Sequence, residues 1–165
     1  MRAPLRLPVA WARFRPTRKK RQGSDGVFNS LWDFEGTWQL DRTILHRAGP
    51  RAQLTGQAVL TRAGQGLDYY ESGVLSLDGQ APVRAERRYL WRPGDAGDVE
   101  ILFEDGRAFH TIVRDAPRAT HECAPDTYEV EYDFSDWPDW QSHWEVTGPW
   151  KAYSMASRYS RVPLR

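Results

Sequence analysis

Turn signals recur along this chain every 8 to 15 residues or so, and this spacing limits the fold more than any other feature. The intervening segments are rich in aromatic and β-branched residues, which favour strands. Such short intervals leave no room for crossover helices, so consecutive strands should pair as an antiparallel meander. The signals stand at nine places: residues 48–50, 63–66, 78–79, 93–97, 105–106, 115–117, 124–126, 135–139 and 148–149.

Nine breaks predict about ten strands, and a sheet of that length tends to close on itself, which removes its exposed edges. The expected fold is therefore all-β, a single closed antiparallel meander barrel. The only helix that we expect is a short one near residues 29–33, lying across one end of the barrel, with Asn29 or Ser30 as its N-cap.

Basic residues are concentrated at the start of the chain. Residues 1–24 hold eight Arg or Lys and no acid, which leaves fifteen basic and twenty-two acidic residues in the remainder. We expect residues 1–26 to form a basic disordered arm and residues 27–165 to form one barrel domain. The arm is interpreted as plain disorder, a start of translation upstream of the useful one, an organelle-targeting peptide or a contact for an acidic partner.

The acidic body lacks the clustered Lys and Arg that phosphate contacts need, so no nucleic acid should bind to the folded domain. Cys123 is the single cysteine, which excludes an intramolecular disulfide and favours a reducing compartment, the cytoplasm. No stretch approaches the roughly 20 apolar residues of a membrane span, so a soluble protein is expected. The oligomeric state stays open.

Two Asp-Gly dipeptides predict hairpin turns, and each turn fixes which residues lie opposite one another. Around Asp105-Gly106, the pairs should be Phe103 with Ala108, Ile101 with His110 and Val99 with Ile112. This face is nearly all apolar, so His110 is expected to point inward.

At Asp78-Gly79 the same reasoning places Tyr70 opposite Arg87, with both inside the barrel near Tyr89 and with Glu71 outside. Arg87 would then be a buried cation among tyrosines. It either binds a carboxylate ligand or pairs internally with Asp68 or Asp126 and holds the barrel in shape.

Alternation assigns the faces of two later segments. Tyr128 and Tyr132 should point inward between acidic neighbours, and Trp140, Trp144 and Val146 should share a face opposite His143. The predicted ligand-binding residues are Tyr70, Arg87, Tyr89, His110, His121, Asp126, Tyr128, Tyr132, Trp144 and Tyr153.

The short connection over residues 115–118 predicts that the strands carrying His110 and His121 are antiparallel neighbours, so that His110, His121 and Cys123 converge. Besides a structural role, this group suggests a two-imidazole, one-thiolate metal site, a Cys/His nucleophile pair or an axial haem ligand. Because the spacing lacks a fourth ligand, we predict no metal site and leave the cofactor unassigned. Asp126 or Glu71 with a tyrosine could instead serve acid–base chemistry, but the sequence does not fix any catalytic geometry.

The segment Phe34-Glu35-Gly36-Thr37-Trp38 resembles the Gly-x-Trp opening of the first strand in lipocalin-like barrels, in which a late-strand Arg packs on the Trp. Here Arg158 or Arg161 would match that Arg. With the motifs at residues 69–73, 121–128 and 148–153, the chain resembles an uncharacterised bacterial family of lipocalin-like domains over residues 32–163. The resemblance implies a calycin-type barrel, distantly similar to the fatty-acid-binding and nitrobindin group, and no assigned activity.

Three functions follow as hypotheses. The first is a protein that binds a small, partly apolar, anionic or aromatic ligand in the barrel interior. The second is an enzyme or a haem- or metal-binding barrel that uses His110, His121 and Cys123. The third is a structural or protein-interaction module with a filled core.

Overall fold

The computed structural model describes residues 27–163, so the predicted basic arm at residues 1–26 lies outside the described part. All ten strands belong to one sheet. Two short 3-10 turns, η1 (Leu31–Phe34) and η2 (Asp95–Gly97), accompany them. The strands are β1 (Gly36–His46), β2 (Arg51–Ala63), β3 (Gly66–Leu77), β4 (Val83–Pro93), β5 (Val99–Phe103), β6 (Ala108–Ile112), β7 (Arg118–Cys123), β8 (Asp126–Asp133), β9 (Trp140–Thr147) and β10 (Ala152–Arg161).

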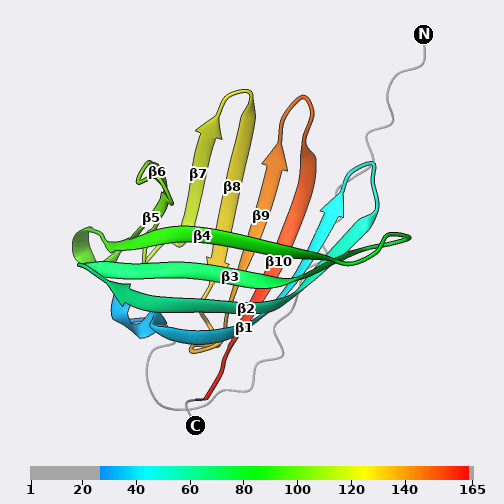
Figure 1. The fold of residues 1–165 in the computed structure, drawn as a ribbon. Helices are drawn as coiled ribbons and strands as arrows, with labels where there is room; N and C mark the ends of the chain where they lie inside the picture. Colours follow the sequence, from blue (N-terminus) through cyan, green and yellow to red (C-terminus); the bar gives the residue numbers. More distant parts are fainter. Residues whose placement is uncertain (1–26, 164–165) are drawn as a thin grey trace.

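The sheet runs in the order β6-β5-β4-β3-β2-β1-β10-β9-β8-β7, with antiparallel neighbours throughout. The predicted antiparallel meander is confirmed, and the first strand pairs with the last, which curls the sheet into a nearly closed barrel (Figure 1). No helix within residues 27–163 is long and apolar enough to cross a membrane.

Full closure was predicted wrongly, because β6 and β7 are the two edges of the sheet and form no ladder. The connection between them makes other backbone bonds. Ala116 N donates to Val113 O, and Tyr132 N in β8 donates to Pro117 O at 2.8 Å. Because Pro117 is bonded to β8, β7 runs alongside β8 from its first residue. The predicted antiparallel pairing of the strands that carry His110 and His121 therefore does not form.

The predicted N-terminal helix is also wrong, because the chain forms only the four-residue 3-10 turn η1. The Asp33 carboxylate accepts hydrogen bonds from the N–H groups of Asn29 and Ser30 and so closes the turn. Leu31 and Phe34 are buried by it. Only two residues separate Asp33 from β1, so the segment ends before an α-helical turn can repeat.

The end of the barrel under η1 is packed with aromatic rings around Trp38, which is fully buried. Of the two arginines expected to match the lipocalin-like pattern, Arg161 packs over Trp38 at 4.7 Å, whereas Arg158 is exposed. Arg161 also donates to the carbonyl oxygens of Asp33 and Glu35, at 2.7 and 2.6 Å. Gly36 has a φ of +131°, and a Cβ there would lie 3.1 Å from Arg161 Nη2, so glycine makes this packing possible. We call this region the closed end.

Candidate functional site

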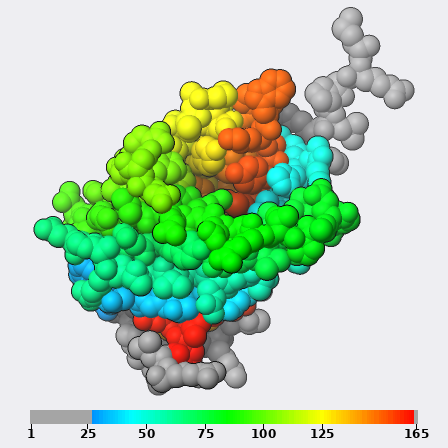
Figure 2. Space-filling view, in the orientation of Figure 1, coloured from blue at the N-terminus to red at the C-terminus, as the bar shows by residue number. Residues whose placement is uncertain are grey.

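A cavity of about 630 Å³ occupies the half of the barrel away from the closed end. Figure 2 shows the surface hollowed between the β3–β4 hairpin (green) and the later strands (yellow and orange). Strands β5 and β6 have only five residues each, and β4 pairs with β5 only from Tyr89 onward. The wall of the barrel is therefore low beside residues 83–88, and the cavity opens there.

Flat aromatic side chains cover much of the cavity wall, with Phe109 at their centre. Its ring stacks on Phe103, Trp144 and Tyr89 at centroid distances of 4.6, 5.4 and 5.6 Å, with interplanar angles below 30° in each case. Edge-to-face contacts with His110 and His121 complete the cluster. Such a wall complements a planar, apolar molecule.

A β-bulge in the β5–β6 hairpin places Phe109 inside. The predicted pairs Ile101 with His110 and Val99 with Ile112 are confirmed, but Leu102 pairs with Ala108, so the predicted pair of Phe103 with Ala108 is wrong. Phe109 is the extra residue, and the bulge lets both it and the adjacent His110 line the cavity.

His110 is a neutral imidazole at ordinary pH. Burial, helped by nearby His121, lowers the pKa of His110 to about 3. Its Nε2 lies 2.7 Å from the Tyr132 hydroxyl, while its buried Nδ1 has no partner among residues 27–163. His121 and Cys123 line the same cavity, with Cys123 exposed at its mouth, so the three predicted residues share one space. The described residues nonetheless contain no cluster of three or more His, Cys, Asp or Glu arranged to hold a metal ion.

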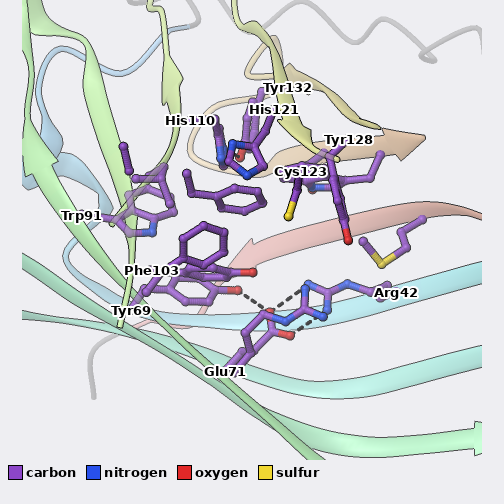
Figure 3. A pocket seen from close by; sticks show the side chains of 18 of the residues that line it. Arg42, Tyr69, Glu71, Trp91, Phe103, His110, His121, Cys123, Tyr128 and Tyr132 are labelled. Atoms are coloured by element: carbon purple, nitrogen blue, oxygen red, sulfur yellow. Dashed lines mark hydrogen bonds and ion pairs between the residues drawn. The ribbon is translucent and has the colours of Figure 1, made fainter. Parts of the chain in front are cut away.

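A buried ion pair lies on the opposite side of the cavity (Figure 3). The Arg42 guanidinium donates to both oxygens of Glu71, at 2.7 and 2.8 Å, and to Ser157 Oγ at 2.8 Å. The side chains of Arg42 and Glu71 are only 6% and 4% exposed. Burial opposes ionisation of Glu71, but the hydrogen bonds and charge of Arg42 outweigh it and lower the pKa of Glu71.

Two tyrosines extend this ion pair toward the closed end. The Tyr69 hydroxyl donates to Glu71 Oε2 at 2.5 Å, and burial, followed by the effects of Tyr159 and Glu71, raises the pKa of Tyr69 well above its usual value. The Tyr159 hydroxyl lies 3.3 Å from both Arg42 Nη2 and the Tyr69 hydroxyl. We call Arg42, Tyr69, Glu71 and Tyr159 the polar cluster.

The register predicted at Asp78-Gly79 is wrong by one residue. β3 ends at Leu77 and β4 begins at Val83, so a five-residue connection replaces the expected two-residue turn. Glu71 therefore lies opposite Arg87, and Tyr70 lies opposite Arg88. A shift of one residue exchanges the faces of a strand, so Glu71 points inward while Tyr70 lies on the outer face, 4.5 Å from the Arg88 guanidinium.

Arg87 keeps its predicted inward face and lines the mouth, where it is exposed to solvent. No carboxylate within residues 27–163 lies within ion-pair distance of it. The internal partners suggested by the sequence are engaged elsewhere, since Asp68 pairs with Arg92 and Asp126 with Lys151. Both oxygens of Glu71, the residue opposite, are bonded to Arg42.

Eight of the ten predicted ligand-binding residues line the cavity: Arg87, Tyr89, His110, His121, Tyr128, Tyr132, Trp144 and Tyr153. Tyr70 and Asp126 do not. Asp126 is buried against Gly148, where a Cβ would lie 2.0 Å from its Oδ1. The predicted outward face of His143 is confirmed.

Arg42, Tyr69 and Tyr159 were not among the residues predicted for the site, and Glu71 was predicted to lie outside the barrel. A signal for Arg42 was present, because it alternates with Trp38 and Leu40 on the inward face of β1. A charged residue in such an apolar alternation indicates a buried polar site.

Comparison with known proteins supports the fold. No curated protein matches the sequence of this chain. A solved structure of an S-type phycobiliprotein lyase from Guillardia theta matches with a TM-score of 0.57 and 11% sequence identity, covering 82% of this chain and 92% of that chain. This likeness concerns the fold. A family model described as a family of unknown function matches residues 34–161, and the chain therefore belongs to that family, DUF6314.

Proposed function

We propose that this protein binds a small, planar, mostly apolar molecule with an anionic group in the barrel cavity. The observation that carries the proposal is the aromatic-lined cavity with Arg87 at its mouth, because Arg87 makes no ion pair within the described part of the chain. Its volume of about 630 Å³ is in the range of small-molecule sites. Protein interiors are otherwise closely packed, so a space of this size calls for an occupant.

The charges inside the cavity favour an anion. Among the lining residues, the three cations Arg42, Arg87 and Arg107 outnumber the two carboxylates of Glu71 and Glu122. His110 stays neutral because its pKa is about 3. A guanidinium that is free of internal partners can bind a carboxylate through two parallel hydrogen bonds. Arg87 would hold the anionic group at the mouth while the rings around Phe109 stack on the planar body.

The alternative hypotheses have weaker support. A module with a filled core does not agree with the presence of the cavity. A metal or haem iron at His110 would need an accessible ring nitrogen, but Nε2 is bonded to Tyr132 and Nδ1 is buried. The Guillardia theta neighbour is named as a lyase, which makes an enzyme of this fold a second candidate. For such an enzyme, His121 and Cys123 at the mouth would be the available groups.

Isothermal titration with 2-naphthoate tests the binding proposal, with neutral 2-naphthamide as the matched probe. We expect 2-naphthoate to bind more tightly, and we expect Arg87→Met to weaken its binding about tenfold, the effect of one charge-assisted contact. The matched control is Arg88→Met, because Arg88 lies on the outer face of the same strand. Absence of binding, or equal effects of the two variants, would refute the proposal.

A further inference from the structure

We infer that the Tyr159 hydroxyl, with Arg42 behind it, is a hydrogen-bond donor site for a neutral carbonyl oxygen at the inner end of the cavity. The inference rests on the proposed function and names a second feature of the ligand. Figure 3 shows Arg42, Glu71 and Tyr69 together on one side of the pocket, facing the histidines across it.

The donors and acceptors of the polar cluster leave one hydrogen without a good partner. Arg42 Nη2 donates to the Tyr159 oxygen, so the Tyr159 hydrogen must point elsewhere. Its other polar neighbour among residues 27–163 is the Tyr69 hydroxyl at 3.3 Å, and the hydrogen of Tyr69 is donated to Glu71. Hydroxyl hydrogen bonds usually measure about 2.7 to 2.8 Å, so this contact is weak and a ligand oxygen can replace it.

The Tyr159 hydroxyl is held in place before any ligand arrives. Its ring stacks on Trp140 at a centroid distance of 3.6 Å and an interplanar angle of 6°, and the residue is 4% exposed. The contact from Arg42 Nη2 is also long, at 3.3 Å, so the positive charge of the guanidinium, more than the hydrogen bond itself, polarises the O–H bond and strengthens it as a donor in a site of low dielectric constant. Such a preorganised donor needs little reorganisation to bind an acceptor.

The acceptor should be uncharged. The charge of Arg42 is already balanced by Glu71, which it contacts through both carboxylate oxygens, so the polar cluster has no net charge to offset the desolvation of a second anion. Arg87 lies opposite Glu71, two residues nearer the mouth than Tyr69. Two residues of a strand span about 7 Å, so the carbonyl group and the charge of the ligand should lie at opposite ends of its planar body.

Three probes test this inference by isothermal titration: 2-naphthoate, 6-acetyl-2-naphthoate and 6-isopropyl-2-naphthoate. The last two have similar shape, but only the acetyl group accepts a hydrogen bond. We expect the acetyl probe to bind about 3- to 10-fold more tightly than the isopropyl probe. Tyr159→Phe keeps the ring on Trp140 and should abolish this preference, while the matched control Tyr70→Phe on the outer face should preserve it.

Infrared difference spectroscopy of the acetyl probe bound to the wild-type protein gives a readout that needs no variant. Its carbonyl stretch should move to lower wavenumber than in a non-hydrogen-bonding solvent. If the probes bind but show no acetyl preference, or if the band does not move, the inference is wrong while the proposed function stands. If none of the three probes binds, the proposed function fails and the inference falls with it.

Discussion

The closed end and the mouth of this barrel both place an arginine beside aromatic rings, yet the two arginines differ in whether their guanidinium groups are already bonded to other residues. Arg161 lies over Trp38 and donates to two backbone carbonyls, so its binding capacity is used within the fold. Arg87 lines the cavity mouth and has no carboxylate partner among residues 27–163. The difference separates a cation that stabilises the barrel from one that is free to bind a ligand.

The aromatic rings divide in the same way. At the closed end, Phe34 packs against Phe28, Phe134 and Trp137, and also against Trp91 and Trp140, which line the inner end of the cavity. Around the mouth, the rings near Phe109 stack on one another but border open space. Stability should therefore depend on the first group and binding on the second.

Trp38→Ala should have the largest effect on stability. It removes a fully buried indole from the closed end and leaves a cavity, which costs about 3–5 kcal/mol. Urea denaturation followed by circular dichroism measures the loss. The matched variant is Trp150→Ala, since Trp150 is 92% exposed and its loss should change the free energy of unfolding by under about 0.5 kcal/mol. Equal effects would contradict the distinction between the two ends.

Breaking the buried ion pair should cost about 3 kcal/mol. Glu71→Leu leaves the Arg42 guanidinium buried without its carboxylate, which is the costly situation, whereas Arg42→Met with Glu71→Leu removes both charges. We expect the double variant to recover most of the lost stability in the same denaturation assay. An additive loss in the double variant would show that the pair acts through packing alone.

Acidification should destabilise the protein through His110. Its pKa is about 3 in the folded protein and about 6.5 when unfolded, so the unfolded chain binds the proton first as pH falls below 6.5. Stability is then lost between pH 6.5 and pH 3, by about 2 kcal/mol from pH 7 to pH 5. Denaturation of His110→Gln at both pH values should show a smaller loss than wild type. Equal losses would mean that His110 is not held neutral.

Substitution of Arg161 or of Arg87 should have the smallest effects on the free energy of unfolding, and the two effects should differ clearly. Arg161→Met removes a cation–π contact and two hydrogen bonds, so it should lower the free energy of unfolding by about 1–2 kcal/mol. Arg87→Met should change it by less than about 0.5 kcal/mol, because no internal bond is lost. Thermal denaturation of both variants makes the comparison. A larger loss for Arg87→Met would show that Arg87 is structural.

Local patterns in the sequence predicted the strands well, because each strand is bounded by its own turn residues. The alternation of Tyr128 and Tyr132 with acidic residues gave the correct faces without knowledge of any partner strand. The register at Asp78-Gly79 failed because the residues after the dipeptide, through Pro82, lengthen the connection. Turn geometry sets the register of a hairpin, so a loop predicted too short placed Tyr70 inside and Glu71 outside, the reverse of what the structure shows.

The polar cluster could not be assembled from the sequence, because its members come from strands far apart along the chain. Arg42 and Glu71 are 29 residues apart, and Arg42 and Tyr159 are 117 apart. Their contact depends on the curvature of the whole sheet, which no local pattern records. The bulge at Phe109 likewise leaves no signal that alternation can detect.

Nuclear magnetic resonance of the tryptophan indole N–H groups during titration with 2-naphthoate tests the central claim most directly. Trp91 and Trp144 line the cavity, Trp38 belongs to the closed end and Trp150 is exposed outside. Binding in the cavity predicts large saturable shifts for Trp91 and Trp144 and little change for Trp38 and Trp150. Shifts confined to Trp150, or no saturable shift at Trp91 and Trp144, would contradict a binding site inside the barrel.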